Sequence, residues 1–153
     1  MILYRLSQRT DPEEVFSGMG AYLHGGRWND RGQYAVYLAE HISLAQLEIL
    51  VNLKDSDTLA QYHLFSLEVP DRSVVFLDDR AYPRNWQARP AASSTRKVGG
   101  DFLKDQSRLC LGVRSCVVPQ EYLVLLNPSH PDASSVISTA RKIPMPFDPR
   151  LFS

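Results

Sequence analysis

Cysteine and closely spaced histidines are scarce in this chain. It has only two cysteines, Cys110 and Cys116, and they do not form a Cys-x-x-Cys pair. Two thiols at this spacing make a poor metal site, and the four histidines also lack the spacing of metal ligands, so we expect no metal. The cysteines could pair with each other, but nothing indicates secretion, and we interpret them as reduced, partly buried thiols.

Long apolar runs and net charge are missing as well. No apolar run approaches the roughly 20 residues needed to span a bilayer, and the N-terminus carries charge too early for a signal peptide. We therefore expect a soluble, cytoplasmic protein. The 17 basic and 17 acidic residues cancel, which argues against direct nucleic-acid binding but allows a local basic pocket for one phosphorylated ligand. A near-zero net charge is compatible with association, including a homodimer.

The composition that is present fits one globular domain over residues 1–153, with an ordinary 44% of hydrophobic residues. Strand-forming or apolar runs lie at residues 2–6, 34–38, 62–69, 73–77, 109–113 and 121–127. We expect a helix with Ser43 as its N-cap that ends near Asp55, and a short helix at 101–108. We expect a long surface loop at residues 83–100. The chain after Pro128 is rich in serine and proline, and residues 144–153 are expected to lie along the surface. This alternation predicts an α+β fold with mainly antiparallel strands and a few helices.

A glycine-rich segment at residues 18–32 is the first candidate for a functional site. It holds five glycines, too many for a stable helix, so we expect a loop that bends sharply or lets a ligand approach the backbone. Arg27 directly follows Gly25 and Gly26, and its planar guanidinium matches phosphate oxygens. The alternative is a glycine turn with a solvated arginine, because the spacing is neither a Walker nor a Rossmann loop. Trp28 either stacks on a planar ligand ring or fills the core.

Glu48 is the second candidate. It lies four residues after Leu44 in the expected helix, so it falls on the apolar face that Leu44, Leu47 and Val51 form by their spacing. An acidic side chain on such a face needs an ion-pair partner, a shifted pKa or a pocket. A structural ion pair and a functional site are both compatible with this position.

Two hydroxyl side chains complete the set of candidates. Tyr37 comes just before the expected helix and could present its phenol to the same space as Glu48. Ser115 could be a nucleophile, but no G-x-S-x-G elbow surrounds it. A turn hydroxyl that satisfies nearby backbone groups is the alternative for Ser115.

Taken together, these segments resemble the RES domain, a toxin family named for its Arg, Glu and Ser. The matching segments, in the order of the family, are Tyr4-Arg5, residues 25–29, 36–39, 45–48 and 115–119, Glu121, and residues 127–131. They extend from about residue 3 to 131, nearly the whole chain. Each motif alone is weak, and their order and intervals carry the resemblance. Arg114 departs from the pattern, since many relatives have proline before the serine.

The resemblance implies a fold related to ADP-ribosyltransferases and an activity on NAD⁺ as substrate. Family members break the nicotinamide–ribose bond by hydrolysis or by phosphorolysis, in which inorganic phosphate is the co-substrate, and some ADP-ribosylate a protein. Loss of NAD⁺ would arrest growth. The resemblance further implies a cognate Xre-type antitoxin that covers the active site. A nucleotide-binding module without catalysis is the competing interpretation of the same residues.

By motif position, the resemblance also assigns roles to residues. The family's Arg, Tyr, Glu and Ser fall on Arg27, Tyr37, Glu48 and Ser115, which are the expected catalytic residues. The residues expected to hold the dinucleotide are Arg5, Gly26, Arg27, Trp28 and Asn127. In this assignment Glu48 stabilises the ribose cation that forms when nicotinamide leaves.

Overall fold

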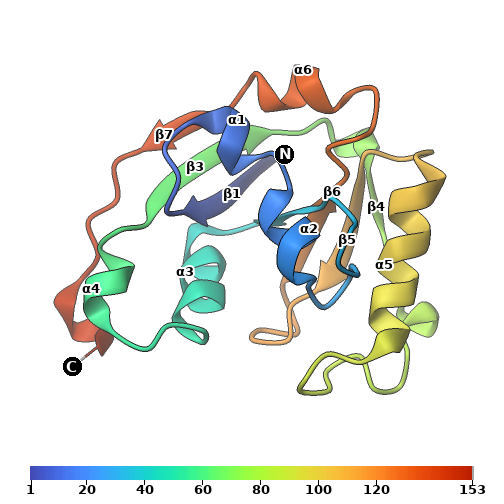
Figure 1. The fold of residues 1–153 in the computed structure, drawn as a ribbon, viewed down its shortest axis with the longest axis horizontal. Coiled ribbons are helices and arrows are strands. Elements are labelled where there is room, and N and C mark those ends of the chain that lie inside the picture. Colours follow the sequence, from blue (N-terminus) through green and yellow to red (C-terminus); the bar gives the residue numbers. More distant parts are fainter. Residues whose placement is uncertain (153) are drawn as a thin grey trace.

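The computed structural model describes residues 1–152, and its centre is a seven-stranded sheet (Figure 1). The strands are β1 (Ile2–Ser7), β2 (Val36–Ala39), β3 (His63–Glu68), β4 (Val74–Phe76), β5 (Cys110–Arg114), β6 (Tyr122–Leu126) and β7 (Arg141–Ile143). Their order in the sheet is β4-β5-β6-β2-β1-β3-β7. The pair β4–β5 is parallel and the other neighbouring pairs are antiparallel. The prediction of a mainly antiparallel α+β fold is confirmed.

Apolar side chains cover both faces of this sheet. Because side chains alternate along a strand, Leu3 and Leu6 of β1 point to opposite faces. Leu3 packs in a cluster with Phe16, whereas Leu6 packs in another cluster with Leu44. The sheet therefore needs a layer of helices on each side.

Six helices supply these layers: α1 (Pro12–Val15), α2 (Met19–His24), α3 (Ile42–Leu50), α4 (Ser56–Leu59), α5 (Ser93–Asp105) and α6 (Ala133–Ile137), all in the described part of the chain. Residues of α1 and α6 pack on the face of Leu3. Residues of α3 and α5 pack on the opposite face, where Figure 1 shows the two helices well apart along the sheet. The candidate site forms between α3 and the glycine-rich segment. None of the helices in residues 1–152 is long and apolar enough to cross a membrane.

Two helices that contain glycines lie where the sequence analysis predicted loops. Helix α2 lies inside the glycine-rich segment and ends at Gly25, whose φ of 71° favours glycine. The expected surface loop at 83–100 stops at Ala92, because α5 begins at Ser93 and includes Gly99. A Cβ on Gly99 would lie 1.8 Å from the carbonyl oxygen of Trp28. The glycines of α5 therefore allow helix and loop backbones to touch.

The helix that carries Glu48 also differs in detail. Its N-cap is His41 rather than Ser43, and it ends at Leu50, well before Asp55. Asp55 instead caps α4 by accepting a hydrogen bond from the amide of Thr58. Leu44 is buried as expected, but Leu47 and Val51 are 39% and 55% exposed. The expected apolar stripe of Leu44, Leu47 and Val51 is therefore wrong beyond Leu44, and α3 buries Ala45 beside it.

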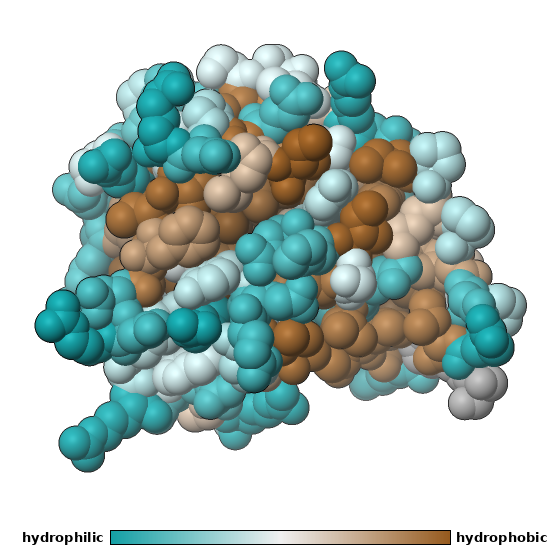
Figure 2. Space-filling model, turned by 180° about the vertical axis from the view of Figure 1, so that it is seen from behind, coloured by the Kyte–Doolittle hydropathy of each residue, from teal (hydrophilic) through white to brown (hydrophobic). Residues whose placement is uncertain are grey.

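The C-terminal quarter, the cysteines and the surface complete the description of the fold. The Ser- and Pro-rich chain after Pro128 contains α6 and β7, two elements that the sequence analysis did not identify. Both cysteines are free thiols, as predicted, and burial raises the pKa of Cys110 to about 12. On the side turned away in Figure 1, apolar and polar side chains alternate in patches (Figure 2). The edge strand β4 leaves Val75 and Phe76 partly exposed, but its three residues offer little backbone for pairing with another chain.

The contact between α5 and Trp28 can be tested by adding one methyl group. We expect Gly99→Ala to lower the free energy of unfolding by about 3 kcal/mol or more, because the new Cβ meets a backbone carbonyl that cannot move aside. Gly20→Ala is the control, since its Cβ would meet nothing within 4 Å. Urea denaturation measures both variants. Equal stability of the two would contradict the packing described here.

Candidate active site

A pocket of about 490 Å³ opens between α3 and the glycine-rich segment. Its volume is in the range typical of small-molecule sites. Six candidate site residues from the sequence line it: Arg5, Gly26, Arg27, Trp28, Tyr37 and Glu48. They come from β1, the glycine-rich segment, β2 and α3, so the fold brings together positions that are far apart in the sequence.

Glu48 is held at this pocket by Ser115. The Ser115 hydroxyl donates a hydrogen bond of 2.6 Å to Oε1 of Glu48 and accepts two of 3.0 Å from the amides of Val117 and Val118. These two amides direct the hydroxyl proton toward the carboxylate. Ser115 is fully buried, and its position favours a turn hydroxyl that positions Glu48 over a nucleophile. No lysine, arginine or histidine within residues 1–152 forms an ion pair with Glu48, so the structural ion pair considered from the sequence is not found.

Arg5 fills a gap in the sheet beneath the pocket. Strands β1 and β2 are registered at Tyr4 opposite Ala39. Beside this residue pair, the Arg5 guanidinium donates one hydrogen bond of 3.1 Å to the carbonyl oxygen of Tyr37. It donates another of 3.0 Å to the carbonyl oxygen of Val15. Burial lowers the pKa of Arg5, but a guanidinium stays protonated in proteins. No carboxylate of the described chain pairs with it, so its positive charge is available to an anion in the pocket.

Arg27 connects the glycine-rich segment to the loop before α5. Its Nη1 donates to the carbonyl oxygens of Trp86, at 3.0 Å, and Ala88, at 2.8 Å. Carbonyl groups do not neutralise the guanidinium, and in the part of the chain that the structure describes no acidic residue pairs with it. One edge of the Arg27 fork therefore organises the loop, and the other N–H groups remain free to bind a ligand.

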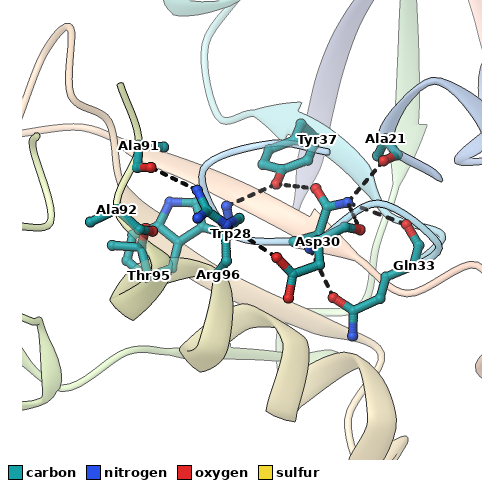
Figure 3. A network of polar contacts seen from close by, with 10 residues as sticks. Ala21, Trp28, Asp30, Gln33, Tyr37, Ala91, Ala92, Thr95 and Arg96 are labelled. Atoms are coloured by element: carbon teal, nitrogen blue, oxygen red, sulfur yellow. Dashed lines mark hydrogen bonds and ion pairs between the residues drawn. The ribbon is translucent and has the colours of Figure 1, made fainter. Parts of the chain in front are cut away.

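Hydrogen bonds of Tyr37 and Asn29 hold the glycine-rich segment in place, and Figure 3 shows Tyr37 beside Trp28. The phenol of Tyr37 donates to Oδ1 of Asn29 at 2.7 Å and accepts from the amide of Trp28 at 3.1 Å. The Asn29 side chain is fully buried and donates to the carbonyl oxygens of Ala21, Asp30 and Gln33. Burial raises the pKa of Tyr37 well above its usual range, so the phenol stays a hydrogen-bond donor.

Gly26 is required by this arrangement. A Cβ at position 26 would lie 2.6 Å from the Tyr37 hydroxyl and 2.9 Å from Oδ1 of Asn29. Only glycine lets the backbone approach the phenol this closely. The geometry thus explains why a glycine directly precedes Arg27.

Sequence comparisons match this chain to known proteins over nearly its whole length. A sequence model of the RES domain matches residues 2–148. The chain belongs to the RES domain family. It is 40% identical over 151 residues to a protein of Yersinia enterocolitica named "Toxin Res", with 99% of each chain covered. It is 37% identical over 148 residues to a "Prs ADP-ribosylating toxin" of a Sphingobium species, with 94% of this chain and 90% of that protein covered.

The fold is also shared with a solved structure. The crystal structure of the M. tuberculosis MbcT–MbcA toxin–antitoxin complex matches with a TM-score of 0.67 at 20% identity. The match covers 82% of this chain and 72% of the other chain. At this level of identity the likeness concerns the fold, and it places this RES domain in the same architecture.

Two residues expected to contact the dinucleotide have side chains with structural roles in this RES domain. Trp28 is 1% exposed and packs edge-to-face against Tyr82, with ring centroids 6.0 Å apart. Its ring is therefore part of the core and not a stacking surface. Asn127 is 1% exposed, donates to the carbonyl oxygen of Leu103 and accepts from the amide of Ser129. It lies outside the pocket lining and joins the end of β6 to α5, so we assign it a structural role.

The pocket lining also includes Arg89, Arg114 and Cys116, to which no site role was assigned from the sequence. Arg114 forms an ion pair of 3.0 Å with Asp79. Burial raises the pKa of Cys116, which keeps its thiol protonated near neutral pH. Arg114 and Cys116 flank Ser115, so their position beside a motif residue was the available signal. Arg89 stands in a long loop, where the sequence carries no signal of its direction.

One group of side chains within residues 1–152 has the spacing of metal ligands, namely Glu40, His41 and Glu121. His41 already pairs with Glu121 at 2.5 Å, and Glu40 accepts a hydrogen bond from the amide of Tyr122. None of these residues lines the pocket. The expectation of no metal therefore stays a prediction, and we assign the group a role in fastening α3 to the turn before β6.

The support of the glycine-rich segment can be tested with Tyr37→Phe. Loss of the hydroxyl leaves the buried Asn29 acceptor and the Trp28 amide without a partner, so we expect a loss of about 1–3 kcal/mol in the free energy of unfolding. Tyr34→Phe is the control, because Tyr34 is exposed and stacks on Tyr22. Chemical denaturation compares the two. A loss of the same size in both variants would refute the proposed support.

Proposed function

We propose that this RES domain protein is a toxin that cleaves the nicotinamide–ribose bond of NAD⁺ in the cytoplasm of its host. The observation that carries the proposal is the Glu48 carboxylate, which Ser115 holds in a pocket shared with the uncompensated cations Arg5 and Arg27. NAD⁺ combines a cationic nicotinamide riboside with an anionic pyrophosphate, and this pocket offers a charge of the opposite sign to each part.

The names of the relatives support the same chemistry. The Yersinia protein is named a toxin, and the Sphingobium protein an ADP-ribosylating toxin. ADP-ribosylation takes its ADP-ribose group from NAD⁺ and breaks the nicotinamide–ribose bond in doing so. A pocket that catalyses this cleavage is therefore consistent with both names.

The proposed reaction breaks the bond between ribose C1″ and the nicotinamide nitrogen. The bonding electron pair leaves with nicotinamide, and positive charge develops on C1″ and the ring oxygen. Glu48 stabilises this charge, while Arg27, the backbone of Gly26 and Arg5 hold the pyrophosphate. An acceptor oxygen then bonds to C1″. Water gives ADP-ribose and a proton, and inorganic phosphate gives ADP-ribose-1″-phosphate.

Transfer of ADP-ribose to a protein is the second candidate function, because the name of the Sphingobium relative describes it. The two candidates share the bond that breaks and differ in the acceptor. Purified protein incubated with adenylate-labelled NAD⁺, with and without phosphate, separates them. Label on a polypeptide supports transfer, whereas free ADP-ribose or its 1″-phosphate supports cleavage.

A protein antitoxin of the Xre type is the proposed partner. The solved structure with the same fold is a toxin–antitoxin complex, and a toxin that consumes NAD⁺ would need inhibition in its own host. Co-expression with the product of the adjacent gene, followed by size-exclusion chromatography, tests this. Separate elution of the two proteins, with no loss of activity, would contradict the proposal.

Glu48→Gln tests the role of the carboxylate. The amide keeps the size of the side chain but removes its charge, so we expect nicotinamide release to fall by about 10²–10³ or more while the fold is retained. Glu68→Gln on the exposed surface of β3 is the matched control and should keep full activity. Release of nicotinamide is followed by chromatography. Full activity of Glu48→Gln would rule out this mechanism.

Ser115→Ala tests whether the serine positions Glu48. A hydrogen bond to a charged group contributes about 1.5–3 kcal/mol, so we expect kcat to fall by about 10- to 150-fold. KM should change little, because the buried serine does not line the pocket. Ser134→Ala on the surface of α6 is the control. A lower melting temperature with unchanged kcat would show that Ser115 is only structural.

A further inference from the structure

A second pocket adjoins the candidate active site and shares Gly25, Gly26 and Arg27 with it. Its volume is about 690 Å³. The remaining lining residues are His24, Asp30, Arg31, Pro90, Ala91 and Arg96. The glycine-rich segment and Arg27 therefore stand between two cavities.

The charges of the second pocket are unbalanced. It has three arginines and one histidine against a single carboxylate, Asp30. Asp30 is already paired with Arg96 at 3.1 Å, and Arg96 also donates to the carbonyl oxygen of Ala91 (Figure 3). Arg31 is exposed and has no hydrogen bond or ion pair within residues 1–152. Arg27 and Arg31 thus give this pocket two cations that lack an anionic partner.

The shape of a dinucleotide indicates what would enter this pocket. Two nucleosides flank the pyrophosphate of NAD⁺, so a site that holds the pyrophosphate at Arg27 must place one nucleoside on each side. Cleavage at Glu48 requires the nicotinamide riboside in the first pocket. The adenosine would then extend into the second pocket, toward Arg31.

The adenosine ribose is where NAD⁺ and NADP⁺ differ. In doubly wound dinucleotide-binding folds, NAD⁺ sites place a carboxylate on the ribose 2′-hydroxyl, whereas NADP⁺ sites offer an arginine to the 2′-phosphate. The same charge complementarity applies to a 2′-phosphate in any fold. Here the carboxylate of Asp30 is occupied by Arg96, while Arg31 is free. The second pocket therefore has the charge pattern that suits a 2′-phosphate.

From this arrangement we infer that the second pocket binds the adenosine half of the substrate and that NADP⁺ is a substrate at least as good as NAD⁺. The inference rests on the proposed function. The bond that breaks is the same, and the products are nicotinamide and ADP-ribose 2′-phosphate, with water or inorganic phosphate as the acceptor. Arg31 is the specificity-determining residue, because it lines the second pocket and its charge has no anionic partner within residues 1–152.

The test compares kcat/KM for NAD⁺ and NADP⁺ in the wild-type protein, in Arg31→Ala and in the control Arg72→Ala, an exposed arginine outside both pockets. We expect the wild-type value for NADP⁺ to equal or exceed that for NAD⁺. Arg31→Ala should lower the NADP⁺ value about tenfold or more, as expected for the loss of a charge-assisted hydrogen bond, and leave the NAD⁺ value nearly unchanged. Arg72→Ala should change neither.

Two results would overturn the inference while leaving the proposed function intact. One is cleavage of NAD⁺ with little cleavage of NADP⁺, and the other is an equal loss for both substrates in Arg31→Ala. If neither dinucleotide is cleaved, the proposed function fails. Calorimetry with ADP-ribose and ADP-ribose 2′-phosphate then measures whether the second pocket prefers the 2′-phosphate. Tighter binding of the 2′-phosphate that is lost in Arg31→Ala supports the inference, and equal binding refutes it.

Discussion

The hydrogen bond from Ser115 to Glu48 is the interaction on which the site depends. It connects α3 to the turn after β5, two elements separated by 67 positions in the sequence. Leu44 and Ala45 bury one side of α3 against the sheet, which leaves Glu48 one turn later at the edge of the pocket. Because the Ser115 hydroxyl accepts from two amides and donates to the carboxylate, the backbone turn itself sets the position of the charge.

The opposite side of the pocket has a support of its own. Asn29 is buried within the glycine-rich segment and accepts a hydrogen bond from Tyr37, and the backbone of Gly26 lies against the phenol of Tyr37. Helix α5 then closes on the backbone of Trp28 at Gly99. The Arg27 side chain is thus presented from a rigid segment, as preorganised electrostatic binding requires. The carboxylate and the cations are fixed by separate sets of contacts, so the pocket keeps their spacing without a ligand.

Local patterns were sufficient for most strands and for the fold class, whereas the resemblance to the RES family placed Arg27, Tyr37 and Glu48 in one site. They failed where the outcome depends on what packs against a residue. Gly99 signals a loop by propensity, yet a helix forms because the glycine makes a backbone contact possible. Helical spacing placed Leu47 on the same face of α3 as Leu44. It could not show that the core buries Leu44 and leaves Leu47 exposed. Trp28 has the chemistry of a ligand-stacking residue, and only its burial shows that it belongs to the core.

The proposed cleavage depends on where the substrate lies relative to Glu48. A crystal structure of the Glu48→Gln protein with NAD⁺ bound measures this directly. We predict that the nicotinamide ribose contacts the side chain at position 48, that the pyrophosphate contacts Arg27, and that the adenosine extends past Gly25 toward Arg31. A dinucleotide bound with its pyrophosphate away from Arg27, or with its nicotinamide ribose outside the pocket of Glu48, would contradict the account.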